Sequence, residues 1–398
     1  ATAALFASSW RPKLSKSGGY SKRPRNSDRG FQQMKVLIAL PGLHSIHRGA
    51  EVAFESLAQK LSELGGFEVT LAGAGVPISG RSYRFLHTPM ISRERFEKFP
   101  KFPPLRSEIR WEELTFAWAL RRSVRSERPD VTVTCSYPFV SWTMRSMKNS
   151  QGKSPQHVFV TQNGDHAAYR TNSEFRWFHC DGLVCTNPGF HEAHKREWNS
   201  KLIPNGVDVS RFSPGVNARA ELGLPADKKI VLMASALIPS KNVSVGVRAV
   251  SVIKDVILAV AGDGPCRDEV DALANELLPG RFVRMSLSPD QMPAFYRSGD
   301  VFLHLSKDES FGNVYIEAMA CGTPVVAHDY STTHWILGSH ATLLESSEPL
   351  SIAAVLQDLL KRPPREKDAL HEAVAERFSW DVIASEYASF FHDLEEQK

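Results

Sequence analysis

The chain has 398 residues, of which 42% are hydrophobic and 23% charged, a composition typical of a globular protein with two or three domains. No run of residues approaches the roughly 18 apolar residues of a membrane-spanning helix. The formal net charge is +4, but residues 1–33 carry seven Lys or Arg against one Asp, so the rest of the chain is slightly acidic. This distribution disfavours a broad nucleic-acid-binding face on the folded part, and we expect no nucleic-acid partner.

Residues 1–33 are rich in Ser, Gly, Lys and Arg and lack hydrophobic periodicity. They are predicted to form a basic, disordered tail. The five cysteines are few and form no CxxC pair. This argues against a disulfide framework or a structural zinc site and indicates a cytoplasmic protein.

A strand, a loop, a helix and a second strand open the chain after the tail. Residues 34–41 are an apolar run closed by a Pro-Gly pair, and the sequence RGAE at residues 48–51 precedes apolar residues at helical spacing. Residues 67–72 read as the second strand, which completes a βαβ unit. Short strands are also predicted at residues 131–135, 158–161 and 182–186.

Residues 81–128 are aromatic, basic and rich in proline. We interpret them as an insertion in the first domain, with a helix over residues 107–128. Further on, the sequence KLIPNGVD at residues 201–208 indicates a strand end and a turn, in which Asn205 and Gly206 would supply a positive φ angle.

The alternation of strands and helices restarts after a polar connection at residues 218–227. Strands are predicted at residues 229–235, 256–261, 282–285, 301–305 and 324–327, and helices at residues 243–250, 268–278, 290–298 and 313–320. The predicted architecture is α/β, with two doubly wound Rossmann-like domains at residues 34–207 and 208–378. Residues 380–394 have the pattern of an amphipathic helix, and we expect residues 379–398 to cross back to the N-terminal domain.

The most informative stretch is SKDESFGNVYIEAMACGTPVVAHD at residues 306–329. Phe311, Gly312 and Asn313 lead into a helix, and a helix N-terminus favours an anion because it presents free backbone N–H groups and a partial positive charge. Glu309 lies in the loop. Glu317 lies about one turn into the helix, where a carboxylate can reach the two hydroxyls of a ribose.

The whole string resembles the E-x7-E signature of glycosyltransferase family 4, the glycosyl transferases group 1, with Glu309 and Glu317 as the two glutamates. Shorter motifs agree: RGAE resembles the family's GGAE loop, IPNGVD its hinge-side motif, GDGP at residues 262–265 its GxGP turn, and SGDV at residues 298–301 the strand entry before the signature. The resemblance covers most of residues 34–394. It implies the GT-B fold, in which two Rossmann-like domains face a central cleft that holds a nucleotide sugar.

The resemblance also implies roles for residues at the matching positions. Glu317 would bind the ribose hydroxyls, and Glu309 would face a ring hydroxyl of the donor sugar. Gly49 would approach the donor diphosphate, and Gly262 would lie near the nucleotide. Backbone N–H groups of four consecutive residues would line the sugar and the diphosphate: Phe311, Gly312, Asn313 and Val314.

A departing diphosphate gains negative charge, so fixed positive groups must meet it. The family supplies an Arg and a Lys about five residues apart after the first strand of the second domain. Lys241 fits the Lys position, whereas the Arg position falls at Ser235 or Ala236, so the Arg is missing. We hypothesise that Arg48, which stands where the family usually has Gly, replaces the lost charge.

Members of the family place a catalytic histidine in a loop of the first domain. In the corresponding loop, VTQNGDH at residues 160–166, His166 is the nearest candidate, and Asn163 or Asp165 are alternatives. His44 and His47 in the first loop are weaker candidates for substrate contact.

The implied activity is retaining transfer of a hexose-type sugar from a nucleotide diphosphate sugar to a sugar, lipid-linked or small-molecule acceptor, as in polysaccharide or glycoconjugate biosynthesis. A retaining enzyme of this type works by positioning and charge stabilisation, without a protein nucleophile. No DxD in a credible loop and no HExxH is present, so we expect transfer without a metal or another cofactor.

Three alternatives follow from particular residues. The missing Arg leaves open a catalytically silent glycosyltransferase-like binding partner. A sugar-nucleotide epimerase or hydrolase of the same fold would need extra acid/base carboxylates in the cleft, which the sequence does not identify. A dehydrogenase is disfavoured because no GxGxxG follows the first strand.

The aromatic and basic residues 96–105, with Lys98 and Lys101, could contact a membrane surface or a lipid-linked acceptor, or pack as part of the insertion.

Overall fold

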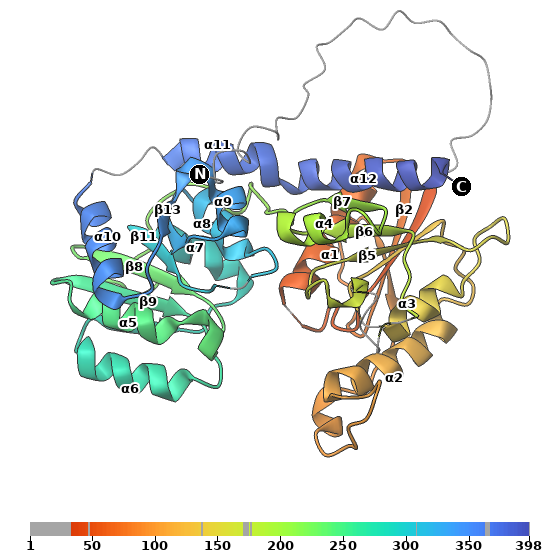
Figure 1. Cartoon of the computed structure of the whole chain (residues 1–398). Coiled ribbons are helices and arrows are strands. Elements are labelled where there is room, and N and C mark those ends of the chain that lie inside the picture. The colour runs from red at the N-terminus through yellow and green to blue at the C-terminus, as the bar shows by residue number, and fades with distance from the viewer. Residues whose placement is uncertain are drawn as a thin grey trace, which may run out of the picture. The chain divides into compact units, whose positions relative to one another are not determined.

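The computed structural model describes residues 33–46, 48–136, 138–169, 175, 177–307, 309–362 and 367–397. The predicted tail, residues 1–33, therefore lies almost entirely outside the described residues. Within them the chain forms two parallel sheets, each with helices on both faces (Figure 1). The predicted α/β class is confirmed, and we call the two halves the first and the second lobe.

The first lobe is built on a seven-stranded sheet with the order β3-β2-β1-β4-β5-β6-β7, in which every neighbouring pair is parallel. Its strands are β1 (Met34–Ala39), β2 (Phe67–Gly73), β3 (Arg84–His87), β4 (Val131–Thr134), β5 (Gln156–Val160), β6 (Gly182–Cys185) and β7 (Ser200–Leu202). Its helices are α1 (Gly49–Leu64), α2 (Glu108–Ser123), α3 (Pro138–Arg145) and α4 (Pro188–His194), with 3-10 turns η2 (Arg93–Phe96) and η3 (His166–Ala168).

The second lobe has a six-stranded parallel sheet with the order β10-β9-β8-β11-β12-β13. Its strands are β8 (Lys229–Ala234), β9 (Val256–Ala261), β10 (Phe282–Met285), β11 (Val301–His304), β12 (Val325–His328) and β13 (Thr342–Leu344). Its helices are α5 (Val243–Ser251), α6 (Arg267–Leu277), α7 (Met292–Arg297), α8 (Asn313–Ala320), α9 (Ser331–Leu337), α10 (Pro349–Lys361) and α11 (Lys367–Phe378), with 3-10 turns η4 (Pro239–Lys241), η5 (Pro289–Gln291) and η6 (Gly338–His340).

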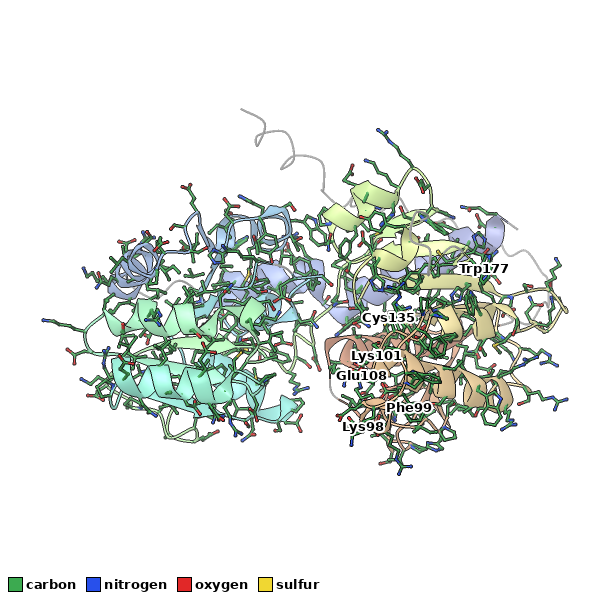
Figure 2. The ribbon with its side chains drawn as sticks, turned by 60° about the horizontal axis from the view of Figure 1, so that its bottom comes forward. Lys98, Phe99, Lys101, Glu108, Cys135 and Trp177 are labelled. Carbon is green, nitrogen blue, oxygen red and sulfur yellow. The ribbon has the colours of Figure 1, made fainter. Side chains whose placement is uncertain are left out.

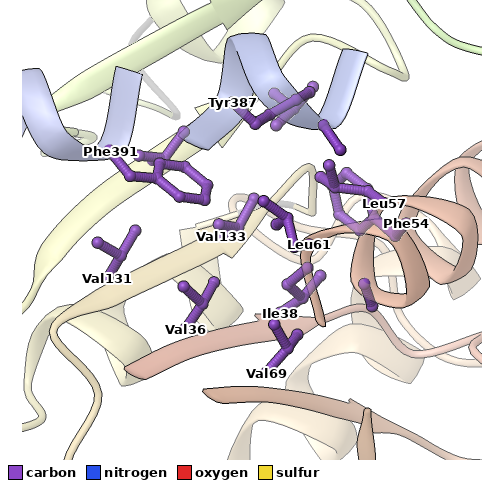
Figure 3. Close-up of a cluster of buried hydrophobic side chains, with 14 of the residues drawn as sticks. Val36, Ile38, Phe54, Leu57, Leu61, Val69, Val131, Val133, Tyr387 and Phe391 are labelled. Atoms are coloured by element: carbon purple, nitrogen blue, oxygen red, sulfur yellow. The ribbon is translucent and has the colours of Figure 1, made fainter. Parts of the chain in front are cut away.

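The last helix, α12 (Trp380–Glu396), belongs to the core of the first lobe. Its apolar stripe contributes Tyr387 and Phe391, which lie over β1 and β4 beside α1 side chains such as Phe54 (Figure 3). Gly182 leaves room for this helix, because a Cβ there would come within 2.8 Å of Leu394. The chain therefore returns to the first lobe after completing the second.

Each sheet reverses its strand order beside its first strand. After β1 the chain adds β2 and β3 on one side and returns to place β4 on the other side, and β8 is flanked in the same way by β9 and β11. In open parallel sheets, ligands bind at the carboxyl ends of the strands beside such switch points. The loops that follow β1, β8 and β11 are therefore where the fold predicts a site.

Two local predictions are wrong. Gly206 does not supply a turn with a positive φ angle; a Cβ at this position would come within 2.5 Å of the Trp380 ring, so the glycine is needed for close packing. The helix predicted over residues 107–128 ends at Ser123, and the chain turns before Arg128, which precedes a proline and is therefore pushed towards an extended conformation.

Candidate functional site

A cavity lies where the carboxyl ends of the two sheets meet. We call it the interlobe cavity. The first lobe contributes the start of α1 and the loop after β5, and the second lobe contributes the loops after β8 and β11 with the start of α8. Its lining residues are Arg48, Gly49, Ala50, Glu51, Gln162, Asn163, Asn205, Ala234, Ser235, Ala236, Lys241, His304, Glu309, Ser310, Phe311, Gly312, Asn313 and Val314.

The N-terminus of α8 forms one wall of this cavity. Phe311 is fully buried, and its ring packs edge-on against Phe378 and Trp335, so it anchors the loop in the core of the second lobe. Gly312 follows with a φ of 93° and serves as the helix N-cap. Gly312, Asn313 and Val314 at the start of the helix line the cavity, and anion binding by their backbone N–H groups stays a prediction.

Glu309 lies between two basic side chains. Its Oε1 accepts a hydrogen bond from Nε2 of His304 at 2.8 Å and another from Nζ of Lys241. Burial alone would raise the pKa of Glu309, but the hydrogen bond and charge of His304, and then those of Lys241, outweigh it and lower the pKa to about 2. The carboxylate is therefore ionised across the physiological range and holds Lys241 in the cavity.

Lys241 is positioned by the loop that follows β8. It ends the 3-10 turn η4, and the next residue, Asn242, adopts a left-handed conformation with a φ of 53°. The Nδ2 atom of Asn242 donates a hydrogen bond to the carbonyl of Leu305 at 2.9 Å, which ties this loop to the loop after β11. The ammonium group therefore has a defined place next to the signature loop.

The position of the missing Arg lies on the cavity wall. Ser235 and Ala236 both line the interlobe cavity, and the Oγ atom of Ser235 is buried without a hydrogen-bond partner. Arg48 lines the same cavity from the other lobe, where it is the N-cap of α1. Among the described residues, the arginine and lysine side chains of the lining are thus Arg48 and Lys241, one from each lobe.

Hydrogen bonds join the lobes beside the cavity. The carbonyl of Ser310 accepts from Nδ2 of Asn187 at 2.7 Å and from Oγ1 of Thr186 at 3.3 Å. Nδ2 of Asn205 donates to Oδ1 of Asn313 at 2.9 Å. The signature loop is therefore held directly against residues that follow strands of the first lobe.

The candidates for the catalytic histidine position lie in different parts of the first lobe. His166 lies in η3 and lines a neighbouring cavity of the first lobe, whereas Asn163 lines both that cavity and the interlobe cavity. Asp165 is engaged elsewhere, because its Oδ2 accepts a hydrogen bond from His194 at 2.9 Å. His44 stacks on Phe85 and bonds to the Tyr83 hydroxyl inside the first lobe, and His47 lies outside the described residues.

Two predicted donor-binding residues do not line the interlobe cavity. Gly262 follows β9 and packs against the loop after β8, where a Cβ would come within 2.0 Å of the Ser235 carbonyl. Glu317 is half-buried in α8, and its Oε2 accepts a hydrogen bond from the Tyr296 hydroxyl at 2.8 Å. Burial raises the pKa of Glu317, and the Tyr296 hydrogen bond opposes this. Its ribose-binding role stays a prediction.

Sequence reasoning missed several residues of the site, chiefly His304, Asn205 and Glu51. His304 had a usable signal, since a histidine that ends an apolar strand of a parallel sheet lies at the carboxyl edge where ligands bind. Asn205 was interpreted only as a turn residue.

Among the described residues, no group of three or more His, Cys, Asp or Glu side chains is placed to hold a metal ion. No described helix is long and apolar enough to cross a bilayer.

Comparisons with known proteins agree with this arrangement. The family described as Glycosyltransferase Family 4 matches residues 47–211, and the family described as Glycosyl transferases group 1 matches residues 217–376. Two relatives are the lipopolysaccharide core biosynthesis glycosyltransferase LpsD of Rhizobium meliloti, 27% identical over 69% of this chain and 78% of the relative, and the D-inositol 3-phosphate glycosyltransferase of Acidothermus cellulolyticus, 33% identical over 48% of each chain. The chain thus spans about half the length of the second relative.

Among solved structures, HepE from Anabaena, in complex with UDP and glucose, superposes with a TM-score of 0.69 at 17% identity, covering 90% of this chain and 100% of HepE. At that identity the likeness concerns the fold. One family matches each lobe, and together the two matches cover the loops that line the cavity. The chain therefore belongs to the group 1 glycosyltransferases, enzymes of the two-domain GT-B fold.

Proposed function

We propose that the chain transfers a hexose-type sugar from a nucleotide diphosphate sugar to a hydroxyl of a carbohydrate, glycolipid or small-molecule acceptor, with retention and without a metal. The observation that carries this proposal is the convergence of Lys241, Glu309 and the α8 N-terminus in one cavity with Arg48 from the other lobe. HepE, a protein of similar fold, was solved with UDP and glucose, which supports a nucleotide sugar as the donor.

The residues present suit a diphosphate leaving group. The N–H groups of α8 and the side chains of Lys241 and Arg48 would stabilise the charge that grows as the bond between the sugar and the phosphate breaks. The acceptor oxygen forms the new bond to the anomeric carbon on the same face, and its proton passes to the leaving phosphate oxygen. Glu309 would orient a ring hydroxyl of the sugar and hold Lys241 in place.

The experiment is a donor screen with UDP-, GDP- and ADP-sugars that follows release of the nucleoside diphosphate, with and without EDTA. Lys241→Ala and Arg48→Ala should each reduce turnover by about 10²–10³-fold, because each removes a charge aimed at the leaving group. Lys228→Ala is the control, since Lys228 pairs with Asp255 on the surface of the second lobe. If Arg48→Ala leaves turnover unchanged while Lys241→Ala abolishes it, the proposed role of Arg48 is wrong.

The missing Arg favours one competing function. Ser235 and Ala236 line the cavity where the family carries a cation, so a chain that binds the donor without turning it over is the second candidate. Saturable binding of a nucleotide sugar with no release of diphosphate, even with acceptors present, would favour this binding protein over the transferase.

A further inference from the structure

A second cavity lies within the first lobe, beside the interlobe cavity. We call it the first-lobe cavity. Arg48, Glu51 and Asn163 line both cavities, so a molecule in one would be next to a molecule in the other. The remaining polar side chains of its lining are Arg93, Glu112, Glu113, Ser136 and His166.

Arg93 and Glu112 in this lining form an ion pair with each other. Glu112 is 4% exposed, and its two carboxylate oxygens accept from the Arg93 guanidinium at 2.7 and 3.3 Å and from the Arg93 backbone N–H at 2.9 Å. Such a bidentate pair satisfies both partners. The Arg93 charge is therefore already neutralised and is a poor binding group for a phosphate.

Glu51 differs from Glu112 because it has no cationic partner of this kind. It lies in the first turn of α1 and is 8% exposed. Burial raises the pKa of its carboxyl, and its own backbone N–H and the charge of Arg48 oppose this. No described side chain donates a hydrogen bond to it. A buried carboxylate with acceptor capacity left over, on the wall of a cavity, is suited to hydroxyl groups of a ligand.

The other charged groups near Glu51 do not give the first-lobe cavity a positive charge. Glu113 adds a second carboxylate, and its Oε1 accepts from the backbone N–H of Val140 at 3.2 Å. Arg48 is exposed at the boundary with the interlobe cavity, where the donor diphosphate would compete for it. Apart from Arg48 at that boundary and Arg93, which pairs with Glu112, the described lining holds no arginine or lysine, so a phosphate deep in the first-lobe cavity would meet Glu51 and Glu113.

We propose that the first-lobe cavity holds the acceptor, and that Glu51 is a specificity-determining residue that selects an uncharged, hydroxyl-rich acceptor group over a phosphorylated one. This inference rests on the proposed transferase function and adds the chemical class of the acceptor. Two neighbouring hydroxyls of a sugar or cyclitol would donate to the Glu51 carboxylate, which orients the ring so that a further hydroxyl faces the interlobe cavity. The same carboxylate would repel a phosphate on that face of the ring.

The test measures acceptor binding by ligand-observed NMR in the presence of saturating UDP, GDP or ADP, whichever binds best. Matched probes are glucose against glucose 6-phosphate and myo-inositol against its monophosphate. The neutral member of a pair should bind more tightly, and Glu51→Gln should weaken it by about tenfold, since hydrogen bonds to a charged group are stronger than neutral ones. The control is Glu55→Gln, one turn along α1, where the carboxylate pairs with Arg81 and lines neither cavity.

Thermal unfolding establishes that Glu51→Gln is folded. Tighter binding of the phosphorylated probes, equal binding of neutral probes to Glu51→Gln and to the parent, or binding of neither class would each overturn the proposal. Failure of the transferase function is recognised separately: neutral probes would then bind in a manner that depends on Glu51, while no sugar nucleotide is turned over in the donor screen.

Discussion

Glu309 is a mostly buried carboxylate held by two basic side chains, and this determines how the stability of the protein should respond to acid. Its pKa is lowered from 4.5 to about 2 by His304 and Lys241, which outweigh burial. Because the folded-state pKa is the lower one, the stabilisation is complete above about pH 4.5 and is lost as the pH falls towards 2. At about 1.36 kcal/mol per pKa unit, the full effect is about 3 kcal/mol.

Glu309→Gln should therefore be less sensitive to acid than the parent. Between pH 7 and pH 3.5, the free energy of unfolding measured in urea should fall by about 1 kcal/mol less in the variant. Glu276→Gln, an exposed acid in α6, is the control and should follow the parent. The same acid sensitivity in Glu309→Gln and the parent would mean that the carboxylate is not held by its two neighbours.

Single residues also show what a sequence can and cannot predict about the site. Lys241, Glu309 and the 311–314 loop were predicted from motif positions, and the structure brings them together in one cavity. The hydrogen bonds of His304 to Glu309 and of Asn205 to Asn313 were not predicted. The second of these joins residues 108 positions apart, and local patterns carry no information about such pairs. His166 was predicted from a loop position, yet Gln162 and Asn163 are the residues of that loop that line the interlobe cavity.

Helix α8 depends on a backbone conformation that only glycine adopts easily. Gly312 has a φ of 93°, and a Cβ there would come within 2.5 Å of the Tyr315 ring. Gly312→Ala should cost about 1–3 kcal/mol of stability through strain. It should also weaken nucleoside diphosphate binding, because relief of the contact would move the first turn of α8, whose residues Asn313 and Val314 line the cavity.

Gly280→Ala is a matched control, since Gly280 also has a positive φ, 69°, but open space around its Cβ position. Thermal unfolding and titration with UDP, GDP or ADP would separate the two effects. Both variants should be less stable than the parent, and only Gly312→Ala should bind the nucleotide more weakly. Equal nucleotide affinities in the two variants would show that the first turn of α8 does not contact the ligand.

Among whole elements, those that bury a continuous apolar face were the ones that could be predicted. The long apolar runs became β1, β8 and β9, which occupy the interior of their sheets, and the helix with an apolar stripe at the C-terminus became α12. The short edge strands β3 and β13 were not predicted, and β7 was predicted only as a strand end from residue 201. They have three or four residues, partly exposed, and so few residues give no periodicity to read.

At the scale of the whole molecule, the aromatic and basic segment before α2 shows why composition alone does not define a surface. The rings of Phe96, Phe99 and Phe102 pack around Trp111 of α2, so the segment folds onto its own lobe. Lys98 and Phe99 come from this segment and lie at the margin of the first lobe in Figure 2. Phe99 is nevertheless 44% exposed. The segment thus does the packing expected of an insertion, and its contact with a membrane surface stays a prediction.

A chain of three side-chain amides connects the two lobes beside the cavity. Gln162 and Asn205 exchange hydrogen bonds, and Asn205 donates onward to Asn313 at the start of α8. Asn205 is 5% exposed, and its removal leaves the half-buried amides of Gln162 and Asn313 without this partner, at a cost of about 1–3 kcal/mol. Because those groups line the interlobe cavity, part of that cost should appear in ligand binding.

We therefore expect Asn205→Ala to reduce the affinity for a nucleoside diphosphate by about tenfold, which corresponds to about 1.4 kcal/mol. The reason is that Arg48 and Gly49 would no longer be held opposite the α8 N-terminus. Calorimetric titration with UDP, GDP or ADP measures the change, and Asn217→Ala, an exposed asparagine early in the second lobe, is the control. A loss of thermal stability with unchanged nucleotide affinity would show that the amide chain supports packing of the lobes without aligning the two halves of the site.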